Sequence, residues 1–110
     1  MGWLDHHREG ESLAATAERL IREGDHRRAR VYFARAAQSE RQALHHVHQD
    51  EVRTRGILAL RAALLSMKAG EFEASIEVAN GALAEPYLPL ELRQQLYELV
   101  RAAIQCQGAA

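Results

Sequence analysis

The spacing of apolar positions along the chain predicts helices and no strands. Apolar residues recur every three or four positions, and no segment sustains the two-residue alternation typical of a half-buried strand. In the segment "ESLAATAERLIREG" one helical face carries Leu13, Ala17, Leu20 and Ile21. This first helix begins either at Ser12 or, as we prefer, a turn or two earlier with Asp5 as its cap, which places Gly10 inside it; we expect it to end near Gly24.

A second, long helix is predicted from Asp25 into the segment "HHVHQD". Asp25 can cap its N-terminus. Its apolar stripe consists of Ala29, Phe33, Ala36, Ala43, Leu44 and Val47. Glu40 occupies one step of this stripe. Either its carboxylate is solvated at the edge of the packing, or a basic group from another helix meets it there.

The third predicted helix, "RTRGILALRAALLSMKAG", is apolar on every face between Gly56 and Met67. We expect it to be buried on more than one side. Arg61 is the single charge in this stretch. A buried guanidinium needs a partner, so Arg61 either pairs with a carboxylate, Glu40 being the preferred candidate, or reaches into a groove to contact a ligand.

Two further helices follow Gly70 and Pro89. The segment "EFEASIEVANGALAE" places Phe72, Ile76, Ala79 and Leu83 on one inner face. Pro86 then breaks the chain, and Pro89 suits the first turn of the last helix. The inner face of that helix is predicted to hold Leu92, Leu96, Leu99, Val100, Ala103 and Ile104. The sequence therefore predicts an all-α protein of five helices.

Two similar phrases, "GDHRRARVYFARAA" and "GEFEASIEVANGAL", begin at Gly24 and Gly70. They resemble the turn and second helix of tetratricopeptide (TPR) repeats, although Ser75 and Ala79 are smaller or more polar than that family would choose. The structural positions of the resemblance are Gly24, Ala29, Phe33, Ala36, Gly70, Phe72, Ala79 and Ala82. It implies one domain with antiparallel hairpins at about 6–50 and about 54–85, closed by a capping helix at about 89–106.

The spacing of the two phrases departs from the TPR pattern. They stand 46 positions apart, whereas the usual period is about 34 residues. A HEAT-like pair would suit the longer spacing, but the turn of glycine, acid and ring favours TPR. We place the excess in the C-terminal half of the second helix, around "QALHHVHQD", and expect that end to lack a partner within its own hairpin.

The TPR resemblance implies a non-catalytic protein–protein interaction module, an adaptor or regulatory subunit. In such stacks the first helix of each pair lines a concave groove. The predicted partner-binding residues are Ile57, Leu60, Arg61, Leu64 and Met67, with Leu44 and Val47. Alternatively, the last helix or Trp3 and Leu4 cover the apolar ones as ordinary core. Stability usually requires three or more repeats, so we expect a second copy or another protein as partner.

Charge and motifs argue against the other functional classes. The net charge is −1, and the "RRAR" segment at 27–30 does not extend into a basic stripe, so nucleic acid is not an expected partner. No nucleophile elbow, phosphate-binding loop or zinc-protease motif is present, so neither an enzyme nor a cofactor is expected. One cysteine, no signal peptide and no long apolar run predict a cytoplasmic protein without membrane contact.

The histidines leave one alternative open. His45 and His48 stand three apart on the predicted second helix, a workable spacing for two metal ligands. A third ligand is lacking, so no metal is expected. The alternative is a small helical regulator that binds nucleic acid or a metal. The preference for arginine over lysine, together with abundant alanine, suggests a bacterial genome rich in GC.

Overall fold

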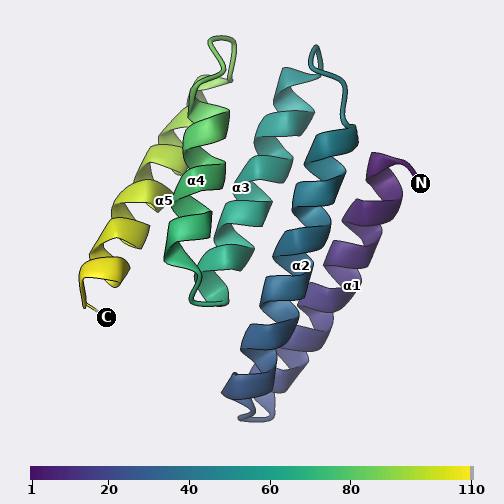
Figure 1. Ribbon diagram of the computed structural model, residues 1–110, viewed down its shortest axis with the longest axis vertical. Helices are drawn as coiled ribbons and strands as arrows, with labels where there is room; N and C mark the ends of the chain where they lie inside the picture. The colour runs from purple at the N-terminus through teal and green to yellow at the C-terminus, as the bar shows by residue number, and fades with distance from the viewer. Residues whose placement is uncertain (110) are drawn as a thin grey trace.

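The chain folds into five helices that lie side by side in chain order (Figure 1). The structure is a computed structural model that describes residues 1–109, and no strand occurs in this range. The helices are α1 (Trp3–Arg22), α2 (His26–His46), α3 (Val52–Lys68), α4 (Phe72–Leu83) and α5 (Leu90–Ala109). Consecutive helices are antiparallel and form a slab of 41 × 36 × 18 Å. The prediction of an all-α fold with five helices is confirmed.

The two similar phrases of the sequence form the same turn. Gly24 and Gly70 have φ angles of +81° and +79°, a conformation that favours glycine. In the first turn Gly24 donates its N–H to the Ile21 carbonyl and Asp25 to the Leu20 carbonyl. The second turn repeats both bonds, from Gly70 to Met67 and from Glu71 to Ser66. Both are the Schellman arrangement, which satisfies carbonyls at a helix end.

The two turns differ in how the next helix is capped. Asp25 accepts the Arg28 N–H through Oδ1 at 3.2 Å, so the predicted cap of the second helix is confirmed. Glu71 makes no such bond at the start of α4. Ala29, Phe33, Ala36 and Ala79 are buried, whereas Phe72 and Ala82 are half-buried. Most of the residues that carry the repeat pattern therefore lie where helices pack closely.

The first helix begins at Trp3, earlier than either predicted start, and Gly2 rather than Asp5 is its N-cap. Asp5 stands in its first turn and accepts the Gly2 N–H at 3.1 Å. Gly10 lies inside the helix and faces α2, where an added Cβ would stand 2.8 Å from Glu40 Oε1. Glycine at this position therefore lets α1 and α2 approach each other around the Glu40 carboxylate.

The prediction that the far end of α2 lacks a partner within its own hairpin is wrong. The second helix is indeed long, with 21 residues against 12 in α4. Because α1 starts so early, its first turns reach that end. Trp3 packs against the buried cluster of Ala43, Val47 and Leu58, and the His6 and His46 rings lie 4.9 Å apart.

Helix α3 is the centre of the fold and packs against α2, α4 and α5. Its predicted burial on more than one side is confirmed. Leu65 joins a core cluster with Leu20 and Phe33 from the first hairpin, while Ala63 joins one with Leu96 from α5. Ile104 does not face this core as predicted, because it lies on the outer side of α5 and is 53% exposed.

Candidate interaction groove

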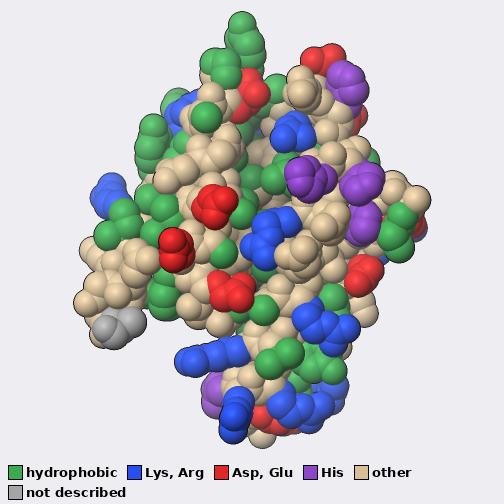
Figure 2. Space-filling view, in the orientation of Figure 1, with side chains coloured by type: hydrophobic (Ala, Val, Ile, Leu, Met, Phe, Trp, Pro, Cys, Tyr) green, Lys and Arg blue, Asp and Glu red, His purple; other side chains and the backbone are tan. Residues whose placement is uncertain are grey.

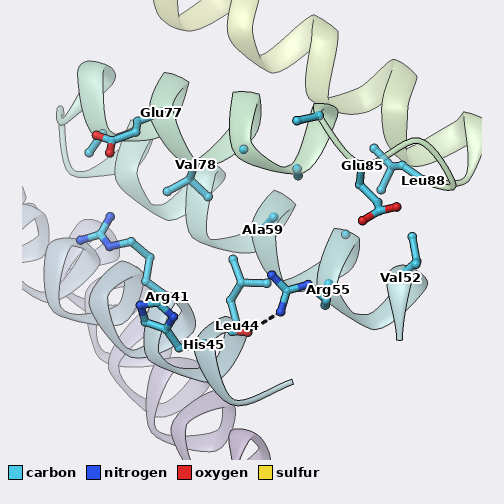
Figure 3. A pocket seen from close by; sticks show the side chains of 15 residues that line it. Arg41, Leu44, His45, Val52, Arg55, Ala59, Glu77, Val78, Glu85 and Leu88 are labelled. Carbon is cyan, nitrogen blue, oxygen red and sulfur yellow. Dashed lines mark hydrogen bonds between the residues drawn. The ribbon is translucent and has the colours of Figure 1, made fainter. Parts of the chain in front are cut away.

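A groove runs over α3 between α2 and α4. The cavity has a volume of about 650 Å³. Figure 3 shows Arg41, Leu44 and His45 of α2 along one side, Glu77 and Val78 of α4 along the other, and Ala59 of α3 between them. The remaining lining residues are Val52, Arg55 and Gly56 of α3, Ala74, Gly81 and Ala82 of α4, and Ala84, Glu85 and Leu88 at one end. Residues of α2, α3 and α4 therefore form one groove, or trough.

Small side chains leave this space open. Ala59 on the floor and Ala74, Gly81 and Ala82 on the α4 side are too short to reach α2. An added Cβ at Gly81 would meet no atom within 4 Å. Gly56 has the opposite surroundings, because a Cβ there would stand 2.6 Å from the Leu88 side chain. Gly56 thus allows Leu88 to close one end of the groove.

The two walls of the groove carry opposite charges. Figure 2 shows Asp and Glu side chains gathered over α4, and basic and histidine side chains over the neighbouring α2. At the groove these are Glu77 and Glu85 on one side, and Arg41 and His45 on the other. None of the ion pairs formed within residues 1–109 joins one wall to the other. The charged side chains of both walls are therefore available to interact with a bound molecule.

The arginines at the groove are held in place by uncharged acceptors. Arg55 donates from Nη1 to the carbonyls of Leu44 and Val47, at 3.1 and 3.0 Å, and so holds the end of α2. Arg41 donates to Ser66 Oγ at 3.3 Å and to the Gln38 side chain at 2.9 Å. A guanidinium has five N–H donors, so Arg41 and Arg55 each retain N–H groups that can donate to a further acceptor.

The groove continues as a second hollow towards the start of α4. This hollow, of about 600 Å³, shares Arg41, Ala74 and Glu77 with the groove. Glu71 and Glu73 add carboxylates to it. The two hollows together follow the full length of α4, whose 12 residues correspond to about 18 Å of helix.

The predicted partner-binding residues do not gather at this groove. None of Ile57, Leu60, Leu64 and Met67 lines the groove. Ile57 and Leu64 are exposed, whereas Leu60 and Met67 pack against the core cluster around Leu96.

On the second helix, only Leu44 of the predicted residues lines the groove. Val47 is buried, so it is not available to a partner. The backbone leaves the helix at Val47, with φ −85° and ψ 135°. This turns its side chain against Ala43 and Leu58.

Sequence reasoning missed the α4 side of the groove. Ala74, Val78, Gly81 and Ala82 recur three and four positions apart, next to the inner face that was recognised. This second stripe of apolar and small residues was the available signal. Because these residues are small, the sequence alone does not distinguish this stripe from an ordinary exposed helix surface.

Arg61 binds Glu40, the preferred of its predicted partners. Arg61 Nε donates to Glu40 Oε2 at 3.1 Å, and the Glu40 side chain is 0% exposed. The interpretation of Glu40 as a solvated residue is therefore wrong. His7 of α1 also contacts this carboxylate, with Nδ1 2.9 Å from Oε1. The three side chains therefore link α1, α2 and α3.

His45 and His48 do not share a helix, contrary to the prediction. The second helix ends at His46, so only His45 stands on it. His48 instead accepts the Asp50 N–H through Nδ1 at 3.2 Å. Within residues 1–109 no three His, Cys, Asp or Glu side chains are grouped as a metal site requires.

None of the helices in the described part of the chain combines the length and apolar character needed to cross a membrane. Comparison of the chain with protein-family models, curated proteins and solved structures gives no match.

Proposed function

We propose that this protein is a non-catalytic interaction module that binds a segment of a partner protein in the groove between α2 and α4. The observation that carries the proposal is the groove itself, with an apolar floor between walls of opposite charge. Open apolar hollows with a few convergent polar groups are typical of binding sites.

The repeated Schellman turns support the interpretation of the fold as two TPR-like hairpins with α5 as the closing helix. In that interpretation α1, α3 and α5 are the first helices, which would line the concave face. The groove instead lies between the second helices, α2 and α4. The proposed binding surface is therefore the face opposite to the one that the TPR resemblance implies.

Filling the groove at Gly81 tests the proposal. An added Cβ at Gly81 meets no atom within 4 Å, so we expect the side chain of Gly81→Trp to occupy the open groove beside α4. We expect this variant to fold and to lose at least tenfold in affinity for the partner segment, measured by calorimetry, because a tenfold loss needs only about 1.4 kcal/mol.

Gly81→Ala is the matched control. It adds only a methyl group and should bind like the natural chain, while stabilising the helix by about 1 kcal/mol. Unchanged affinity of the folded Gly81→Trp variant would overturn the assignment of the groove.

The outer face of α5 favours a second copy of the chain as a further candidate partner. Leu90, Tyr97 and Ile104 recur every seven residues and are 79%, 53% and 53% exposed. A seven-residue spacing places them in one stripe, as in helices that pair with another helix. Tyr97 lies midway between the other two, so the stripe is symmetric about it and suits an antiparallel pair.

A further inference from the structure

The charges along the groove specify what kind of segment it takes. We propose that the occupant is an amphipathic helix of a partner protein, with Lys or Arg along the edge that faces α4 and Asp or Glu along the edge that faces α2. This inference rests on the proposed function, because it assigns the ligand class of the same groove.

The shape of the site favours a helix over an extended peptide. The trough lies between two helices and follows α4 for about 18 Å, or roughly three turns of a bound helix. The small residues Ala59, Gly81 and Ala82 let a further helix approach closely, while Leu44, Val78 and Leu88 offer apolar contacts. The described residues form no sheet edge, which an added strand requires. The groove over Ala59 has no Phe, Trp or Tyr, and Phe72 is the one such residue that lines the second hollow, whereas proline-rich segments bind to grooves lined with several aromatic residues.

The α4 edge of the trough is acidic along its whole length. Glu77 and Glu85 lie at the groove, and Glu71 and Glu73 extend the series into the second hollow. None of these four carboxylates takes part in an ion pair within residues 1–109. A bound segment with basic residues along this edge would supply the missing counter-charges.

The opposite edge is basic. Arg41 and Arg55 keep free N–H donors there, and the His45 ring stands beside them. A bound helix with acidic residues on both edges would place carboxylates next to the glutamates of the α4 edge. One with basic residues on both edges would place cations next to the arginines of the α2 edge. Like charges across an interface disfavour the wrong partner, so the walls select a helix with one edge of each sign.

Three designed peptides test this selection. All share one leucine stripe and one length, and they differ only in the residues bordering the stripe: Lys on one edge and Glu on the other, Glu on both, or Lys on both. We expect the mixed peptide to bind tightest at low ionic strength, and the peptide with Glu on both edges to bind about tenfold more weakly, measured by calorimetry.

A charge reversal on the protein provides a second test. Glu77→Lys should lower the affinity for the mixed peptide severalfold and raise the affinity for the peptide with Glu on both edges. Glu98→Lys makes the same change on the exposed surface of α5, where it lines neither hollow. This control should leave the order of the three affinities unchanged.

The outcomes separate this inference from the proposed function. If the three peptides bind equally and Glu77→Lys changes nothing, while Gly81→Trp still abolishes binding, the groove is a docking site and the charge assignment is wrong. If the mixed peptide does not bind, or binds Gly81→Trp as tightly as the natural chain, the inference fails. If none of the three peptides binds Gly81→Trp more weakly than the natural chain, the proposed function fails too.

Discussion

At the scale of single residues, two ion pairs of nearly equal length lie in very different surroundings. Arg61 reaches Glu40 at 3.1 Å, and Arg53 of the same helix reaches Glu91 at 3.0 Å. Glu40 is fully buried, whereas Arg53 and Glu91 are 65% and 64% exposed. Removal of Arg61 would leave the buried Glu40 carboxylate without its basic partner, whereas water can replace either member of the exposed pair at little cost.

Arg61→Ala is therefore predicted to destabilise the protein by about 2 kcal/mol, because it removes a partner from a buried carboxylate. We expect no larger loss of stability, because the Arg61 side chain is 38% exposed and water weakens its interaction with Glu40. Arg53→Ala is the matched control and should change the stability by less than about 0.5 kcal/mol. Urea unfolding followed by circular dichroism measures both. Equal stability of the two variants would show that Arg61 has no structural role.

At the scale of helices, α5 combines a buried and an exposed apolar face. Leu92, Leu96 and Leu99 pack into the core, while the stripe of Leu90, Tyr97 and Ile104 faces outward. In an antiparallel pair of copies, Leu90 of one would lie against Ile104 of the other. If the partner is another copy of the chain, we expect the two copies to meet through this contact.

Tyr97→Glu is predicted to prevent association of the chain while leaving the fold intact, because Tyr97 lies at the centre of the stripe and is half exposed. Light scattering over a dilution series measures the molecular mass. The natural chain should gain mass with concentration, and Tyr97→Glu should not. Gln95→Glu adds the same charge on an exposed part of α5 outside the stripe and should associate like the natural chain. A natural chain that remains monomeric at every concentration would exclude the α5 contact.

The sequence predicted correctly those features of the helices that depend on residues close together in the chain. The number of helices, the glycine turns and the Asp25 cap follow from residues close together in the chain. The Arg61–Glu40 contact was predictable because each charge interrupts an apolar surface. His7 was not predicted as a third partner, since its place beside Glu40 depends on how α1 packs across Gly10.

At the scale of the whole molecule, the site was harder to predict than the fold. A groove is the space left between helices, and here it arises because Ala59, Gly81 and Ala82 are small where α2 and α4 flank α3. The partner surface predicted from the sequence instead included Ile57 and Leu64, which are exposed but do not line the groove. Leu44 and Val47, three positions apart, differ in exposure because the helix ends between them.

The central claim is that a partner helix binds between α2 and α4, and amide chemical-shift mapping tests it most directly. Labelled protein is titrated with the mixed peptide and then with the segment of its natural partner. We predict that the largest shifts fall on the groove, at Leu44, Arg55, Val78 and Gly81, and that the amides of Ile57 and Leu64 change little. Shifts concentrated at Ile57 and Leu64 would place the partner outside the groove and contradict the account.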